Sequence, residues 1–244
     1  MNTRPTASPS TAMVLAAGLG KRMRPITSTI PKPLVEIKGK ALIDYGLDAL
    51  ERAGVRRAVV NVHYLADLMQ AHLRRREGLE IAISDERDTL LESGGGIVRA
   101  LPLIGPDPFY VLNADTFWID GYRDNLQLMA ELWEPERMDI LLLIADMRQA
   151  TGYEGRGDFV MDAEGRLARV PERDMSPFIY AGAAILKPEL FAGMAEEKFS
   201  LNRLFDAAIE KGTLFGVRLD GLWITVGTPE AIPEAEAVFQ TSAA

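Results

Sequence analysis

The sequence predicts an α/β fold: a single domain whose sheet is mixed but mainly parallel, with helices on both of its faces. Two observations lead to this prediction. Short apolar segments alternate with amphipathic segments through residues 12–146, a pattern typical of strand–helix–strand units in parallel sheets. Residues 155–226 instead contain closely spaced short strands and a hairpin signal, which makes the sheet mixed.

The first half alternates strands with helices. Its strands are expected at the apolar runs Ala12–Ala16, Arg57–Val62, Leu79–Ser84, Pro108–Asn113 and Asp139–Asp146. The first helix, Ala41–Ala53, has its apolar residues on one face at helical spacing, and Gly54 is a typical helix end. The other helices of this half are expected at Leu65–Arg75, Gly94–Leu101 and Tyr122–Leu132.

The second half begins with a hairpin over residues 155–170, turning at residues 163–166. The remaining elements are expected as strands at Phe178–Leu186, Leu214–Leu219 and Leu222–Val226, and helices at Pro188–Met194, Leu201–Lys211 and Pro229–Thr241. No linker separates the halves, so a single domain is expected over residues 11–244. Residues 1–10 are polar, with two prolines, and are expected to be a disordered leader.

Composition excludes several classes of function. The chain of 244 residues has 48% hydrophobic and 25% charged residues, which is ordinary for a globular protein. Its net charge of −8 disfavours nucleic-acid binding. The absence of cysteine removes disulfides, thiolate metal sites and a cysteine nucleophile. No apolar run reaches the roughly 18 residues of a membrane span, and the N-terminus lacks a signal-peptide pattern, so a cytoplasmic protein without a membrane partner is expected.

A local basic segment stands out against this acidic background. The first strand leads into Ala17–Gly20, whose small residues let backbone N–H groups approach an anion closely. Lys21 and Arg22 follow at once, and Lys32 lies between two prolines. Residues 21–40 contain six cations and one acid. These features indicate a polyphosphate site.

Two familiar phosphate loops are excluded by the residues that follow Gly20. A Walker A loop requires Lys followed by Ser or Thr, whereas Lys21 is followed by Arg22. The dinucleotide fingerprint requires a third small residue where this chain has Met23.

The segments Leu15–Thr27 and Pro31–Leu34 resemble the signature of the sugar-1-phosphate nucleotidyltransferases, Leu-Ala-Ala-Gly-x-Gly-x-Arg-Met-x-Pro-x-Thr followed by Pro-Lys-Pro-Leu. The resemblance extends over roughly residues 12–236. It implies a Rossmann-like fold and transfer of a nucleotidyl group from an NTP to a sugar 1-phosphate with release of pyrophosphate. It also implies Mg²⁺, or Mn²⁺ in its place, as the cofactor.

The resemblance assigns roles to individual residues. A second glycine-rich loop opens a helix at Glu92–Gly96 and lies over the nucleobase in the family; a helix N-terminus of this kind suits a phosphate or a base edge. The implied nucleotide-binding residues are Ala16, Ala17, Gly18, Gly20, Lys21, Arg22, Glu92, Gly94 and Gly95. The implied catalytic residues are Arg22, Lys32 and Asp115.

The sugar phosphate and the metal are expected on the other side of the site. Asp115 follows a strand at the edge of the sheet where ligands bind, and the family's equivalent aspartate is a metal ligand. The implied sugar-phosphate residues are Lys32, Asn113, Gly157, Asp158, Arg173 and Gly182, with the hairpin lying over the sugar.

Thr225 departs from the family pattern. The family's closing motif, Trp-x-Asp-x-Gly-Thr, supplies a second metal ligand from its Asp, and this chain has Thr225 in that place. A hydroxyl is a poorer Mg²⁺ ligand than a carboxylate, so either Thr225 acts through a metal-bound water or the enzyme uses fewer protein ligands.

Two details favour one substrate pair. Glu92-Ser-Gly-Gly-Gly and Gly155-Arg-Gly-Asp-Phe resemble the N-acetylmuramate-1-phosphate uridylyltransferases, which implies UTP and N-acetylmuramate 1-phosphate. Mannose 1-phosphate with GTP is the alternative, followed by a thymidylyl or cytidylyl transferase. A nucleotide-sugar binding or regulatory protein, with Thr225 marking lost catalysis, also stays open. The sequence is compatible with a monomer or a homodimer.

Overall fold

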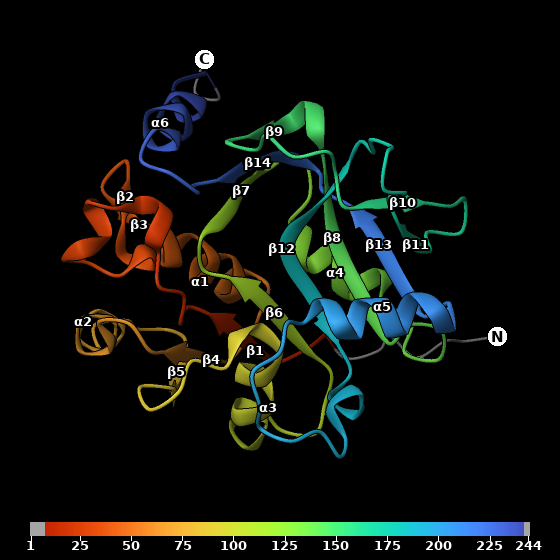
Figure 1. Ribbon diagram of the computed structural model, residues 1–244, viewed down its shortest axis with the longest axis horizontal. Helices are drawn as coiled ribbons and strands as arrows, with labels where there is room; N and C mark the ends of the chain where they lie inside the picture. The colour runs from red at the N-terminus through yellow and green to blue at the C-terminus, as the bar shows by residue number, and fades with distance from the viewer. Residues whose placement is uncertain (1–7, 242–244) are drawn as a thin grey trace.

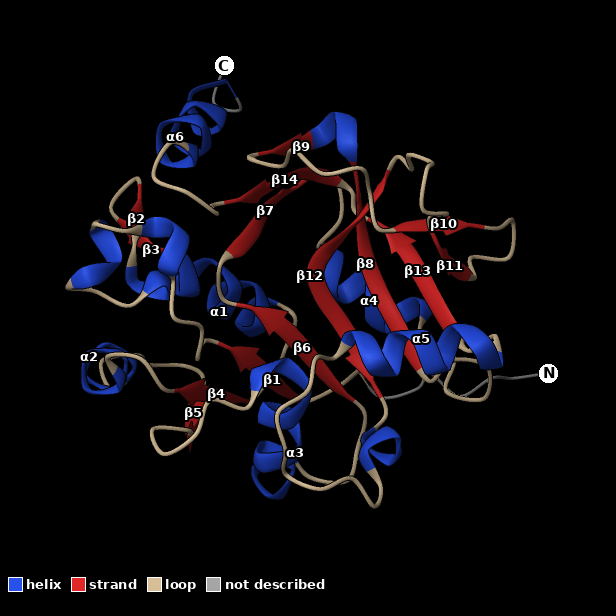
Figure 2. Ribbon diagram, viewed as in Figure 1, coloured by secondary structure: helices blue, strands red, loops and turns tan. Residues whose placement is uncertain are grey.

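The computed structural model describes residues 8–241 and has a nine-stranded sheet at its centre (Figures 1 and 2). Seven strands run in the order β11-β10-β12-β6-β1-β4-β5, and β8 and β13 continue from β12. Their bounds are β1 Thr11–Leu15, β4 Arg57–Val62, β5 Glu80–Asp85, β6 Phe109–Asn113, β8 Ile140–Asp146, β10 Phe159–Met161, β11 Leu167–Arg169, β12 Phe178–Leu186 and β13 Leu214–Arg218. The four strands β6, β1, β4 and β5 are parallel neighbours, whereas β12 runs antiparallel to both β6 and β8. The predicted α/β fold with a mixed, mostly parallel sheet is confirmed.

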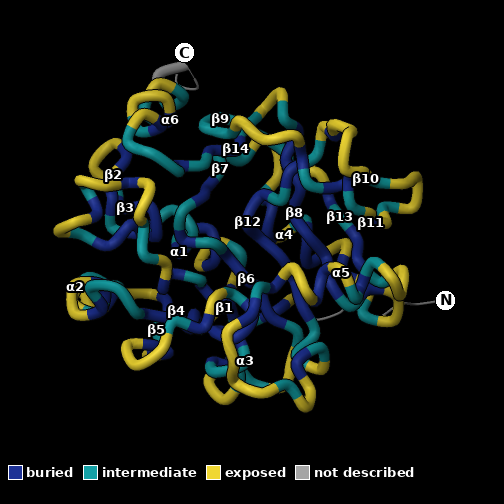
Figure 3. Tube along the Cα trace, in the orientation of Figure 1, coloured by how far each residue is buried: buried dark blue, intermediate teal, exposed yellow. Residues whose placement is uncertain are grey.

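Helices cover both faces of this sheet. The helices α1 (Leu42–Arg52), α2 (Ala66–Leu73) and α4 (Asn125–Leu132) pack on one face, and α3 (Glu92–Ile104) and α5 (Asn202–Lys211) pack on the other. The sequence of strand β1 is continuously apolar because both of its faces are buried. Ala12 and Val14 pack under the first set of helices, and Met13 packs under the second. Figure 3 shows the buried residues concentrated along these strands.

A second, smaller sheet closes one side of the molecule. It consists of β7 (Thr116–Asp120), β14 (Gly221–Thr225) and β9 (Ala150–Thr151). The helix α6 (Ala231–Thr241) packs against it through a third apolar cluster that includes Met23, Phe117 and Ile224. The sequence pattern did not predict β7, nor the two-residue strands β9, β2 (Glu36–Ile37) and β3 (Lys40–Ala41). Strands of two residues are stabilised by their partners rather than by local sequence.

Several boundaries differ from the sequence predictions. Helix α3 begins at Glu92 and continues past Pro102 to Ile104, and α4 begins at Asn125 rather than Tyr122. Residues 188–191 form a 3-10 turn instead of a longer helix. The hairpin turn is tighter than four residues, because the Asp162 N–H donates to the Arg166 carbonyl.

The N-terminal boundary also moves. Residues 1–7 of the expected leader lie outside the described residues. Pro9 is buried, and the Ser10 carbonyl accepts hydrogen bonds from the N–H groups of Arg56 and Arg57 at 2.9 and 3.3 Å. Residues 9 and 10 therefore belong to the fold and not to a leader. Over residues 8–241, no helix has both the length and the hydropathy needed to cross a membrane.

Candidate functional site

Two cavities meet at the carboxyl ends of the central parallel strands. The first has a volume of about 390 Å³ and is lined by Leu15, Ala16, Ala17, Gly18, Lys32, Pro33, Asn61, Leu90, Glu92, Ser93, Asn113, Ala114 and Asp115. The second, of about 630 Å³, is lined by Arg22, Asn113, Asp115, Thr116, Gly152, Tyr153, Glu154, Gly155, Asp158, Ile179, Tyr180, Trp223, Thr225, Gly227, Thr228, Glu230, Ala231 and Glu234. Asn113 and Asp115 line both cavities. The site can therefore hold two ligands that touch at this junction.

An ion pair lies at the junction. Lys32 Nζ donates to Asp115 Oδ2 at 2.7 Å, with the lysine side chain 10% exposed and the aspartate 38% exposed. Lys32 begins a 3-10 turn after Pro31, and Asp115 occupies the turn between β6 and β7. A lysine charge that is largely shielded from water acts more strongly on a neighbouring phosphate than an exposed lysine does.

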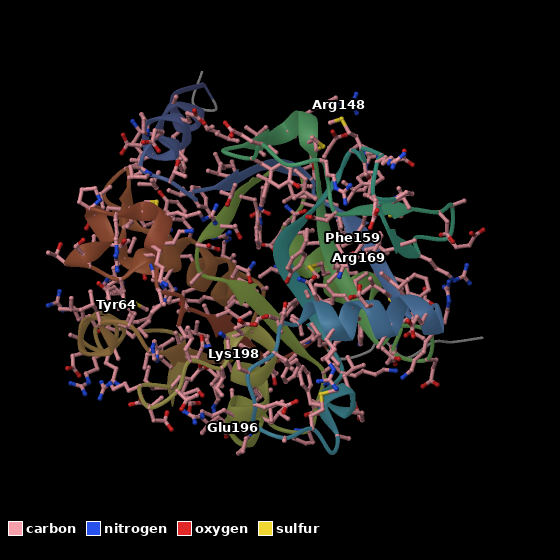
Figure 4. The ribbon with its side chains drawn as sticks, viewed as in Figure 1. Tyr64, Arg148, Phe159, Arg169, Glu196 and Lys198 are labelled. Carbon is pink, nitrogen blue, oxygen red and sulfur yellow. The ribbon has the colours of Figure 1, made fainter. Side chains whose placement is uncertain are left out.

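The signature loop is held in shape from within. Gly20 has a left-handed φ of 59°, and a Cβ atom there would lie 3.0 Å from Thr27 Cγ2 and 3.1 Å from Lys32 Cβ. The Thr27 hydroxyl donates to the Gly20 carbonyl at 2.8 Å, and the Tyr64 hydroxyl donates to the Thr27 carbonyl at 2.8 Å. Figure 4 labels Tyr64, which lies in the connection between β4 and α2. Gly20 thus permits the close packing that fixes Lys32.

The two cations after Gly20 lie apart. Arg22 lines the second cavity, where its guanidinium lies beside Gly227. Lys21 is exposed and lines neither cavity. The sequence could not separate these neighbours, because a 3-10 turn at Lys21–Met23 directs them differently.

The glycines of the second loop are packing glycines. Glu92 and Ser93 line the first cavity, but Gly94 and Gly95 do not. Their N–H groups donate to the Phe199 carbonyl at 2.9 and 3.4 Å. A Cβ atom would lie 2.2 Å from the Phe199 ring at Gly94 and 2.0 Å from the Glu197 carbonyl at Gly95. The N–H groups of Gly94 and Gly95 are therefore already bonded within the protein, and the expected contact of these glycines with the nucleotide stays a prediction.

A buried polar network connects the two loops. The Ala16 N–H donates to Asn61 Oδ1 at 2.7 Å, and Asn61 Nδ2 donates to Glu86 Oε1 at 2.7 Å. Glu86 Oε2 accepts from the Leu91 N–H at 3.2 Å. Glu86 is fully buried, and burial raises the pKa of its carboxyl. The signal that could have revealed Asn61 is its position as a polar residue inside an apolar strand.

The residues expected at the sugar phosphate divide into two groups. Asn113 and Asp158 line the second cavity, and Asp158 Oδ2 accepts from the Tyr180 N–H at 2.8 Å. Gly157 and Gly182 have left-handed φ values of 85° and 83° and pack against Ser176 and Thr116, outside the cavity lining.

Arg173 lies away from the cavities, whereas the start of the hairpin lines the second cavity. Arg173 is exposed and belongs to neither cavity lining. Strands β10 and β11 extend the edge of the sheet, whereas residues 152–155 and Asp158, at the start of the predicted hairpin, line the second cavity. The start of the hairpin therefore borders the proposed sugar site, and its paired strands lie outside the cavity lining.

Sequence reasoning missed an aromatic and acidic wall of the second cavity. Tyr153 accepts a hydrogen bond from the Gly157 N–H at 3.2 Å and packs edge-on against Trp223, with ring centroids 5.9 Å apart. Glu230 and Glu234 reach the cavity from the start of α6. No motif marks these residues, because only the fold brings α6 to the junction.

The donor set fits a magnesium ion that is shared with phosphates. Asp115 and Thr225 both line the second cavity, and the Val226 N–H donates to the Asp115 carbonyl at 3.4 Å. In the part of the chain that the structure describes, no three acidic, histidine or cysteine side chains form a group that could hold a metal. One carboxylate is compatible with Mg²⁺, which often takes its other ligands from water and substrate phosphates.

Comparisons with known proteins agree with this geometry. A family model described as nucleotidyl transferase matches residues 11–242. The chain is 47% identical over 234 residues to the N-acetylmuramate alpha-1-phosphate uridylyltransferase of Caulobacter vibrioides, covering 94% of this chain and 97% of the relative. It is 32% identical to the protein of the same description from Neisseria meningitidis serogroup B, covering 93% and 97%. Its fold matches the inositol-1-phosphate CTP transferase structure from T. maritima with a TM-score of 0.73 and 20% identity, covering 94% and 97%.

We expect Gly18→Ala to weaken nucleotide binding without loss of stability. A Cβ atom at Gly18 would meet nothing within 4 Å, so the methyl group would occupy only space in the first cavity. We expect the Kd for NTP, measured by calorimetry, to rise on the order of tenfold, or about 1.4 kcal/mol. The control is Gly95→Ala, where overpacking against Glu197 should lower the free energy of unfolding by about 1–3 kcal/mol. Unchanged NTP binding in the Gly18 variant would contradict this expectation.

We expect Glu86→Gln to change how stability depends on pH. The raised pKa of Glu86 means that the folded state binds the proton more tightly than the unfolded state. The free energy of unfolding therefore falls as the pH rises from about 4.5, the ordinary value, towards the raised pKa. Glutamine does not titrate, so the variant does not lose stability in this way. In thermal unfolding at pH 4.5–7.5, the stability of the variant relative to that of wild type should therefore increase as the pH rises. A difference that is constant with pH would contradict the assignment.

Proposed function

Since this chain belongs to the nucleotidyl transferase family, we propose that it transfers a uridylyl group from UTP to N-acetylmuramate 1-phosphate and releases pyrophosphate. The chain is a sugar-1-phosphate nucleotidyltransferase. The observation that carries the proposal is the meeting of two cavities at Asn113 and Asp115, since group transfer requires both substrates to touch. The first cavity would take the nucleotide and the second the sugar.

The reaction needs no protein nucleophile. A phosphate monoester has a second pKa near 6 and is mostly dianionic at neutral pH. One of its oxygens attacks the α-phosphorus of the NTP, a new P–O bond forms, and the bond from the α-phosphorus to the bridging oxygen of the β-phosphate breaks. Pyrophosphate leaves with that electron pair. The protein contributes alignment and neutralisation of charge.

The cations of the site suit this task. Lys32 lies at the junction in a largely buried place, where it would neutralise the approaching phosphates. Arg22 is the one cation in the lining of the second cavity as the structure describes it, so it would contact the phosphate of the sugar 1-phosphate on that side. Its contact with the departing pyrophosphate stays a prediction from the resemblance. A planar guanidinium can hold two phosphate oxygens at once.

Magnesium would be held by Asp115, with Thr225 acting through a water molecule. When bound, it would neutralise phosphate charge at the junction. Asp115 lies in both cavity linings, which supports this assignment.

The substrate pair rests on similarity. The relatives described as N-acetylmuramate alpha-1-phosphate uridylyltransferases share 47% and 32% identity with this chain over almost their full length. Mannose 1-phosphate with GTP, and thymidylyl or cytidylyl transfer, are the alternatives. The Lys32–Asp115 pair favours an active enzyme over a binding protein that has lost catalysis. A cytoplasmic location, and a monomer or homodimer, stay predictions.

A pyrophosphate-release assay tests the proposal. Purified protein is assayed with Mg²⁺ against UTP, GTP, CTP and dTTP, each combined with N-acetylmuramate, mannose, glucose and N-acetylglucosamine 1-phosphates. The pair of UTP with N-acetylmuramate 1-phosphate should give the highest kcat/KM. Higher activity with GTP and mannose 1-phosphate would establish the alternative, and no release with any pair would favour a binding protein.

We expect Lys32→Ala to lower kcat by a factor on the order of 10²–10³, because one positioned charge at a developing anion contributes about that much. The matched control is Lys187→Ala, which removes another partly buried Lys–Asp pair at 3.0 Å, with both residues outside the two cavity linings. Circular dichroism should show both variants folded. Wild-type turnover in folded Lys32→Ala would remove this residue from the mechanism.

We expect Thr225→Asp to tighten the apparent affinity for Mg²⁺ while turnover holds or rises. Position 225 lines the same cavity as Asp115, so the substitution adds a carboxylate ligand of the kind that a hard cation prefers. Titrations of Mg²⁺ at saturating NTP compare the two proteins. Unchanged metal affinity would show that residue 225 does not act on the metal.

A further inference from the structure

A segment from the second half of the chain crosses the start of α3. We call residues 197–199 the strap. The Glu197 carbonyl packs against Gly95, the Phe199 ring packs against Gly94, and the Phe199 carbonyl accepts the Gly94 N–H at 2.9 Å. Figure 1 shows this stretch passing over α3 just before α5 begins. The strap therefore forms part of the surroundings of the loop that lines the first cavity.

Lys198, the middle residue of the strap, places a positive charge beside a residue of that cavity lining. Lys198 lies between two residues whose backbone or ring is packed against α3, so the position of its own backbone is fixed (Figure 4). Its Nζ lies 3.4 Å from Glu92 Oε1, and Glu92 lines the first cavity. Glu92 has a left-handed φ of 61°, an uncommon conformation for a residue with a side chain, held here by the packing around it.

The charges of the first cavity explain what this pair does. Its described lining contains two carboxylates, Glu92 and Asp115, and one cation, Lys32. Asp115 is paired with Lys32, which leaves Glu92 to be neutralised from outside the lining. Lys198 supplies that charge. Without it, an entering triphosphate would meet an uncompensated carboxylate.

We propose that Lys198 is a positioning residue of the nucleotide site: it neutralises and orients Glu92, and so raises affinity for the NTP but not for the sugar phosphate. This inference rests on the proposed function, because it takes the first cavity to be the nucleotide site. A residue from the second half of the chain would thus help to bind a nucleotide that is otherwise held by the glycine-rich loops of the first half.

The test uses a graded series at residue 198. Lys198→Ala should raise the KM for UTP, and the Kd for UTP measured by calorimetry, about two- to fivefold, the range expected for an exposed ion pair. Lys198→Glu should raise both further, and Lys198→Arg should match wild type. The KM for sugar 1-phosphate and kcat should not change in any variant.

A matched control is Arg203 of α5, which pairs with the first residue of the same strap. Arg203 Nη1 is 3.5 Å from Glu197 Oε1, and the exposure of its side chain, 62%, is close to the 61% of Lys198. Neither Arg203 nor Glu197 belongs to the cavity linings. Arg203→Ala and Arg203→Glu should leave the Kd and KM for UTP unchanged.

Two further measurements separate electrostatic positioning from a structural role. The effect of Lys198→Ala should disappear at about 0.5 M salt, because exposed charges are screened. In a Glu92→Gln background, Lys198→Ala should change the Kd for UTP by less than twofold, because the charge that it neutralises is gone. An effect that persists in salt, or in the Glu92→Gln background, would overturn the proposal.

Failure of this inference is distinguishable from failure of the proposed function. If wild type releases pyrophosphate but Lys198→Ala and Lys198→Glu bind UTP as wild type does, the role of Lys198 is refuted and the enzyme assignment stands. If wild type releases no pyrophosphate with any pair, the proposed function fails. The calorimetric series with UTP still decides the role of Lys198 in that case, and wild type that binds no UTP would overturn it.

Discussion

The ion pair between Lys32 and Asp115 is the contact on which the arrangement of the site depends. It joins two loops that are 83 residues apart in sequence and lies where the two cavities meet. Each partner is set by its own local structure: a proline-bounded turn holds the lysine, and the turn between β6 and β7 holds the aspartate. A free lysine at this depth would carry a large desolvation cost, so the aspartate that neutralises it also fixes the geometry of the junction.

Hydrogen bonds and close packing around the cavities hold the loops of the site in position. The chain of hydrogen bonds from Ala16 through Asn61 to Glu86 ties the phosphate loop to the loop before α3. Glycines act in the same way, because Gly20 and Gly95 allow backbones and side chains to approach where a Cβ atom would not fit. The rigidity of the site therefore comes in part from Glu86, Gly20 and Gly95, which lie outside the two cavity linings.

The two halves of the chain build one site in common. The phosphate loop and α3 come from the first half, whereas β14, the start of α6 and the strap come from the second. The second cavity is walled mainly by residues after 150, although Arg22 reaches it from the signature loop. Strand β12 runs antiparallel to β6, and Ala183 of β12 pairs with Leu112 near the carboxyl end of β6. The second half of the chain is thereby brought to the edge of the sheet where Asn113 and Asp115 lie.

The sequence by itself determined the α/β class, most strands and the glycine-rich loop after the first strand, because local periodicity and motif spacing carry that information. The resemblance assigned Lys32 and Asp115 to one site, and the structure showed that they form an ion pair. The resemblance also singled out Thr225. Tertiary structure alone decided which glycines are bare and which are packed: Gly18 faces open space, whereas Gly94 and Gly95 are covered by the strap. It likewise decided that Arg173 lies outside the cavities and that Glu230 and Lys198 lie near them. Such contacts join residues far apart in sequence, and no local pattern encodes which long-range surfaces will pack together.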